Sequence, residues 1–147
     1  MQNAITELEQ ITLTSGAKNF LRETAKWGKF LSILGFIALG LMLLGSFFIS
    51  SFYNTLPQAD IMPFDLGIVV TLIYTVVALI CIFPIYYLYQ FSAKMKEALI
   101  SKDDAVLVTA FEMLKSHYKF IGVATIITLS IYILLAIIVF TGVLSAV

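Results

Sequence analysis

The stretch that decides the fold is residues 120–147, FIGVATIITLSIYILLAIIVFTGVLSAV. It has no charged side chain and exceeds the roughly 20 apolar residues that a helix needs to cross a bilayer. Residues 30–53 and 66–91 are two further apolar stretches without a charge. Lipid cannot satisfy backbone hydrogen bonds, and no stretch alternates with a period of two, so each is predicted to be a transmembrane helix.

The composition also indicates an integral membrane protein. Of the 147 residues, 61% are hydrophobic and 12% are charged, whereas soluble domains are about 45–50% apolar and about 25% charged. The net charge of zero gives no field that would attract nucleic acid. The single cysteine, Cys81, cannot form a disulfide within the chain. We therefore expect the lipid bilayer, and no nucleic acid, as a partner.

The basic residues predict the orientation. They precede the first apolar stretch or separate the second from the third, and they are Lys18, Arg22, Lys26, Lys29, Lys94, Lys96, Lys102, Lys115 and Lys119. Lysine and arginine stay on the cytoplasmic side, so we expect a cytoplasmic N-terminus, an outer loop near Pro57 and Pro63, and a C-terminus outside. The first apolar stretch is longer than a signal-peptide core of about 7–15 residues, which predicts a retained span.

An N-terminal amphipathic helix is predicted before the first span. Apolar residues from Leu13 onward keep helical spacing, and Thr14 or Ser15 is a suitable N-cap. This helix should run into the first span. Asp65 is the expected N-cap of the second span, where Phe64 could pack on the first turn.

A second amphipathic helix is predicted over residues 103–118, between the second and third spans. Asp103 or Asp104 would cap it, after a break near Ser101–Lys102. Its apolar face comprises Leu107, Ala110, Phe111, Leu114 and Tyr118. The residues expected to dock on a partner helix or on the inner leaflet are Leu107, Phe111 and Leu114.

Small residues form one face of the first span. At about 100° per residue they fall within about 60° of each other, and they are Gly28, Ser32, Gly35, Ser46 and Ser50. Small side chains let helix backbones approach closely in lipid. This face therefore predicts either helix packing within one chain or the seam of a homo-oligomer.

Hydroxyl-bearing residues form a face on each of the other two spans. The second span contributes Thr71, Tyr74, Thr75, Cys81 and Tyr89, and the third contributes Thr125, Thr128 and Tyr132. These faces predict either a polar contact between the two helices or the wall of a pore built from several copies. Pro84, inside the second span, should kink that helix and would act either as a static bend or as a hinge.

Aromatic rings gather at the predicted inner boundary, where Trp27, Tyr86, Tyr87 and Tyr118 are expected to anchor the chain in the headgroup region.

The sequence has no nucleophile elbow, phosphate loop, HExxH motif or dinucleotide fingerprint. It has one histidine, His117, and no second one to share a zinc ion. We therefore expect neither an enzyme nor a cofactor or metal site.

Three stretches resemble one bacterial family of small three-span inner-membrane proteins that is known only as a domain of unknown function. The first is LRETAKWGKFL at residues 21–31 with Ile33 and Gly35, the second is YLYQFS at residues 87–92 with Ala98, and the third is Leu114–Lys115 with Tyr118–Lys119–Phe120 and Gly122. The resemblance covers roughly residues 14–145. The resemblance implies a multi-pass protein of the bacterial inner membrane, and it implies no particular activity.

These observations predict an all-α integral membrane protein with three transmembrane helices and two amphipathic helices. Residues 1–13 are expected to be a disordered segment, and residues 14–147 a single membrane domain. The predicted function is a non-catalytic scaffold or assembly subunit. The alternative is a homo-oligomeric channel lined by the hydroxyl-bearing faces of the second and third spans.

Overall fold

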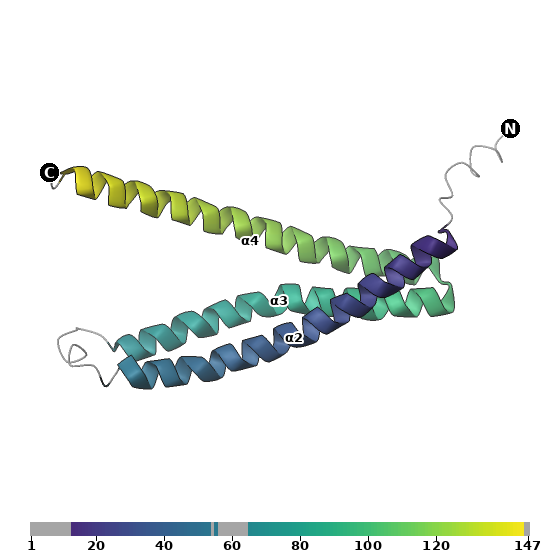
Figure 1. The fold of residues 1–147 in the computed structure, drawn as a ribbon, viewed down its shortest axis with the longest axis horizontal. Coiled ribbons are helices and arrows are strands. Elements are labelled where there is room, and N and C mark those ends of the chain that lie inside the picture. The colour runs from purple at the N-terminus through teal and green to yellow at the C-terminus, as the bar shows by residue number, and fades with distance from the viewer. Residues whose placement is uncertain (1–12, 54, 56–64, 146–147) are drawn as a thin grey trace.

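The computed structural model of the chain describes residues 13–53, 55 and 65–145. It contains α2 (Ser15–Tyr53), α3 (Leu66–Ser101) and α4 (Asp104–Ser145). Figure 1 shows α2 and α3 side by side as a hairpin, while α4 packs at one end and diverges from the hairpin toward the other. All three helices are long and apolar enough to cross a membrane, so the predicted all-α fold with three spans is confirmed at that level.

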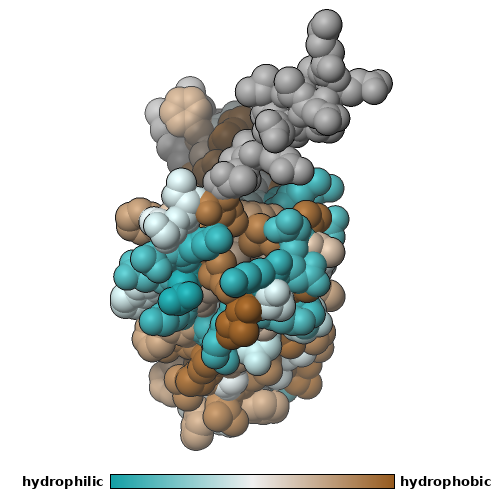
Figure 2. Space-filling view, turned by 90° about the vertical axis from the view of Figure 1, so that its right-hand side faces the viewer, coloured by the Kyte–Doolittle hydropathy of each residue, from teal (hydrophilic) through white to brown (hydrophobic). Residues whose placement is uncertain are grey.

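Each helix is longer than a bilayer requires. The lengths of 39, 36 and 42 residues correspond to about 54–63 Å, against a hydrocarbon core of about 30 Å. All nine basic residues fall at one end of the bundle, within residues 15–29 and 92–119. We call this part the charged end, and the remainder of the three helices the apolar part. The space-filling view of this end shows hydrophilic residues gathered over it (Figure 2).

The prediction of a separate amphipathic helix between the second and third spans is wrong, because residues 104–118 form the beginning of α4, which continues without interruption through Ser145. The N-terminal amphipathic segment is the first part of α2, as expected of a helix that runs into the first span. A helix end leaves four unpaired backbone groups that need partners. Around Lys119 and Phe120 the chain has neither a proline nor a capping side chain, so continuing the helix is the lower-energy choice.

The predicted helix ends are confirmed where the structure describes them. The Thr14 and Asp65 side chains accept backbone N–H groups of the first turns of α2 and α3 at 3.3 and 3.0 Å. The break after Ser101 is present, because Lys102 adopts a left-handed φ of 55° and its N–H donates to the Ala98 carbonyl. Asp103 then accepts the Ala105 N–H at 2.9 Å, as the capping prediction required.

The hydrophobic core lies at the charged end, where all three helices meet. Its buried residues are Ala25 from α2, Phe91 and Met95 from α3, and Ala110 from α4. Partly buried apolar side chains surround them, namely Leu21, Leu88, Leu99, Leu107, Met113 and Leu114. In contrast, the most apolar window of α4 has no buried residue within the described chain. The charged end therefore holds the three helices together.

Two predictions fall outside the described residues. The disorder expected of residues 1–13 concerns a segment of which only Leu13 is described, and the packing of Phe64 onto α3 involves a residue beyond the described ranges.

Candidate functional site

The small-residue face of α2 packs against α3. Gly28 and Ser32 are buried, and a Cβ atom added to Gly28 would lie 2.5 Å from the Ser92 Oγ. A Cβ atom at Gly35 would lie 3.1 Å from the Ile85 side chain. Gly28 and Gly35 of this face thus lie close to α3 side chains within the chain.

Serine hydroxyls on this face need no partner on α3. Ser32 donates to the Lys29 carbonyl at 2.8 Å, and Ser46 donates to the Leu43 carbonyl at 2.7 Å. Each hydroxyl is thus satisfied by its own helix, so burial leaves no unpaired polar group. Ser50 lies at the same face and is half-buried.

The hydroxyl-bearing faces of α3 and α4 are not brought together. On α3, Tyr74 and Cys81 are half-buried, and Thr71 and Thr75 donate to carbonyls of their own helix at 3.0 and 2.8 Å. The Tyr89 ring contacts Phe36 of α2 edge to face. On α4 the three predicted residues are all exposed, namely Thr125, Thr128 and Tyr132.

A contact that the sequence analysis missed joins α3 to α4. The His117 Nδ1 atom lies 2.7 Å from the Pro84 carbonyl oxygen, across 33 residues of chain. Because a carbonyl only accepts, Nδ1 must carry the proton and donate. The lone histidine and the proline were visible in the sequence, but no spacing rule indicates which turn of α4 faces Pro84. The helix α3 continues through Pro84, and α4 diverges from α3 toward its own C-terminal end (Figure 1).

Loss of the His117 side chain should loosen the α3–α4 contact. We expect His117→Ala to cost about 0.6 kcal/mol, with an upper bound of about 1.7 kcal/mol, which is the range for hydrogen bonds between membrane helices. Spin labels at the exposed positions Leu79 and Ile126, in a Cys81→Ser background, should report a broader interhelical distance distribution. His117→Asn, which can still donate near the Nδ1 position, should keep the original distribution. Identical distributions for His117→Ala and wild type would contradict this role.

A groove of about 500 Å³ opens where α4 leaves α3. Ile80 and Tyr87 line it from α3, and Ser116, Lys119, Phe120 and Ile127 are among the residues that line it from α4. The Phe83 and Phe120 rings, with centroids 6.4 Å apart, bridge the two helices at this level. The groove therefore joins the charged end to the open face of α4.

The predicted docking residues of α4 divide into two groups. Leu107 and Leu114 are half-buried against the chain's own core, so they already have an intramolecular partner. Phe111 is 43% exposed and remains accessible.

Of the predicted anchors, Trp27, Tyr86 and Tyr118 are exposed, whereas Tyr87 is half-buried. The exposed rings lie where the charged end meets the apolar part.

The described residues offer no cluster of metal-ligating side chains. Within them, no group of three or more histidine, cysteine, aspartate or glutamate side chains could hold a metal ion. The ion pair among them joins Lys94 and Glu97 at 3.0 Å, one turn apart on α3 and exposed. Such a pair contributes about 0–1 kcal/mol, so it does not organise a site.

The chain matches no protein-family model, no curated protein and no solved structure. The resemblance to the bacterial inner-membrane family therefore stays a prediction. The features that bear on function are the open apolar part of α4 and the basic residues of the charged end.

Proposed function

We propose that this protein is a non-catalytic assembly subunit of the bacterial inner membrane, and that the apolar part of α4 binds a helix of a partner membrane protein. The observation that carries the proposal is that this part of α4 has no buried residue in the described structure. The hairpin of α2 and α3 packs on itself and is held to α4 at the charged end. The helix α4 is thus packed against α2 and α3 at the charged end, and its apolar part is exposed.

The hydroxyl group of Tyr132 distinguishes the exposed surface of α4 from a surface that contacts only lipid. Tyr132 is 65% exposed, and its hydroxyl has no hydrogen-bond partner among the described residues. It lies 13 residues beyond Lys119, or about 20 Å along the helix, which is deep within a hydrocarbon core of about 30 Å. An unpaired hydroxyl there costs several kcal/mol in an alkane-like medium, so an acceptor on a neighbouring helix is favoured.

The residues around Tyr132 suit a close helix contact. Thr125, Thr128 and Ala136 lie on the same side of α4 at helical spacing. We call these residues together with Tyr132 the Tyr132 face. Small side chains beside a tyrosine permit close backbone approach, and the hydroxyl can then bond across the interface.

The orientation follows the charge distribution. All nine basic residues lie at the charged end, which favours a cytoplasmic location for this end and an outer location for the C-terminal end of α4. The partner helix would then meet α4 inside the membrane, while the core around Met95 holds the base of α4 at the inner surface.

Photo-crosslinking tests the proposal. With benzoylphenylalanine in place of Thr128 in native membranes, we expect a protein adduct of one discrete mass. The matched control is the same probe at Leu134, which is exposed and about 180° around the helix from Thr125, and it should give lipid adducts only. Tyr132→Phe should weaken the Thr128 adduct about threefold, because a single interhelical hydrogen bond contributes about 0.6 kcal/mol. Lipid adducts alone from both positions would contradict the proposal.

The channel remains the alternative, and the same experiment separates it. An adduct with the mass of two copies of this chain, together with conductance in planar bilayers that changes in Thr128→Leu, would favour a homo-oligomeric pore. The geometry favours the subunit, because Thr71 and Thr75 of α3 each donate to a carbonyl of their own helix and so need no polar partner.

A further inference from the structure

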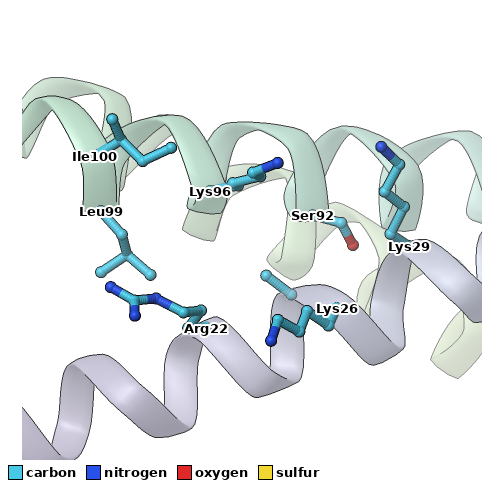
Figure 3. Close-up of a pocket in the computed structure, with 8 residues that line it drawn as sticks. Arg22, Lys26, Lys29, Ser92, Lys96, Leu99 and Ile100 are labelled. Carbon is cyan, nitrogen blue, oxygen red and sulfur yellow. The ribbon is translucent and has the colours of Figure 1, made fainter.

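The two basic stretches of the chain meet in one cavity of about 340 Å³ at the charged end. Arg22, Lys26 and Lys29 line it from α2, and Lys96 lines it from α3. Figure 3 shows the Arg22 side chain extending from α2 toward Leu99 of α3. Four basic residues from distant parts of the sequence thus line one space. We call it the basic cavity.

The cations of the basic cavity have no anionic partner in the described part of the chain. No aspartate or glutamate lines the cavity, and the nearby Glu97 pairs with Lys94, which is not a lining residue. An anion bound among the basic residues of the cavity would gain charge-assisted hydrogen bonds from Arg22 and the lysines.

The position of the basic cavity points to the membrane surface. Lys29 comes directly before the apolar part of α2, and the buried Ser92, which lines the same cavity, directly follows Phe91 of α3. The exposed rings of Trp27 and Phe30 pack edge to face at the same level of α2, as interfacial aromatic residues do. The cavity is therefore at the level of lipid headgroups.

Its size and lining fit a headgroup better than a larger ligand. A volume of about 340 Å³ is at the lower end of the range for small-molecule sites, about 300–1,000 Å³. Between the cations lie the apolar side chains of Ala25, Leu99 and Ile100, which can contact the glycerol and the first methylenes of a lipid. Basic pockets between membrane helices on the cytoplasmic side suit anionic headgroups.

We propose that the basic cavity binds the phosphate group of an anionic phospholipid. Arg22 can hold two phosphate oxygens at once, and Lys26, Lys29 and Lys96 supply point charges around them. The site is on α2 and α3, away from the open face of α4, and does not depend on the proposed partner of α4.

Lipid retention measured by native mass spectrometry tests the site. The full chain, in nanodiscs of phosphatidylcholine with a minor fraction of phosphatidylglycerol, should retain phosphatidylglycerol selectively on release. In the variant with Arg22→Gln, Lys26→Gln, Lys29→Gln and Lys96→Gln, retention should fall at least about tenfold, since each basic residue near an anionic surface contributes severalfold. These side chains are exposed, so the fold should be kept.

A matched variant separates the site from general charge. The matched variant replaces Lys18, Lys102, Lys115 and Lys119 by glutamine, which removes the same number of positive charges. None of these residues lines the basic cavity. It should reduce retention less than about threefold, and so should the charge-keeping variant with Lys26→Arg, Lys29→Arg and Lys96→Arg. Equal losses in both glutamine variants, or a large loss in the arginine variant, would overturn the proposal.

A second arm identifies the source of the phosphate group. Millimolar inorganic phosphate, added to the detergent-solubilised protein with bound phosphatidylglycerol, should leave the lipid in place, because a free ion gains nothing from Ala25, Leu99 and Ile100. Displacement of the lipid by inorganic phosphate would assign the site to a soluble anion and would overturn the lipid assignment.

Discussion

Replacing Met95 by alanine is expected to lower the free energy of unfolding by about 2–5 kcal/mol, the cost of a large-to-small change at a fully buried position. Met95 is 0% exposed and belongs to the core in which α2, α3 and α4 meet. Most of that core lies at the charged end, where water supplies a hydrophobic driving force that lipid cannot supply. The variant therefore removes contacts from all three helices at once.

The effect of Met95→Ala can be measured by titration with sodium dodecyl sulfate, followed through the fluorescence of Trp27, the single tryptophan. Met95→Leu, which nearly conserves volume, should cost less than about 1.5 kcal/mol. Val108→Ala on α4 is the exposed control, since Val108 is 61% exposed, and it should stay within about 0.5 kcal/mol of wild type. A Met95→Ala variant as stable as the Val108→Ala control would show that this core does not hold the bundle.

Gly28→Leu is expected to separate α2 from α3 and to cost at least about 1–3 kcal/mol, the usual range for overpacking. An added Cβ atom already lies 2.5 Å from the Ser92 Oγ, 3.5 Å from Leu88 and 3.7 Å from Phe91. A leucine side chain has no space at this contact unless the helices move apart. The same detergent titration measures the loss.

Two comparisons make the Gly28 prediction specific. Gly40→Leu introduces the same side chain on the same helix where nothing lies within 4 Å, and it should be neutral or slightly stabilising because leucine favours the helix more than glycine does. The smaller change Gly28→Ala should destabilise wild type more than it destabilises a Ser92→Ala background, where the hydroxyl is gone. Equal costs for Gly28→Leu and Gly40→Leu would contradict the close approach of α2 and α3.

The contacts at the charged end explain how one chain can have a fixed hairpin and an open helix. Along the apolar part, α2 and α3 stay together because small residues such as Ser32 and Ser46 are fully buried at their contact. In the described part of α4 no residue after Ala110 is buried, and the bond from His117 to Pro84 joins α4 to α3. The Tyr132 face therefore remains available to another helix.

Some site residues could be predicted from the sequence because they are set by interactions between residues that are close along the chain. The small-residue face around Gly28 and Ser32 follows from helical spacing, and its burial against α3 is one of the two uses predicted for it. The basic cavity could not be predicted, since joining Lys29 to Lys96 requires knowing which faces of α2 and α3 meet. The contact between His117 and Pro84 could not be predicted for the same reason.

The sequence by itself determined the three apolar helices and their ends, because apolar length and capping act over a few residues, as at Asp65 and at the break after Ser101. The tertiary structure alone decided that α4 continues without interruption from the charged end into the apolar part, that α3 pairs with α2 along its length, and that α4 diverges. The physical reason is that a helix apolar on every side, like α4 beyond Phe120, carries no periodic signal to indicate which face meets a neighbour.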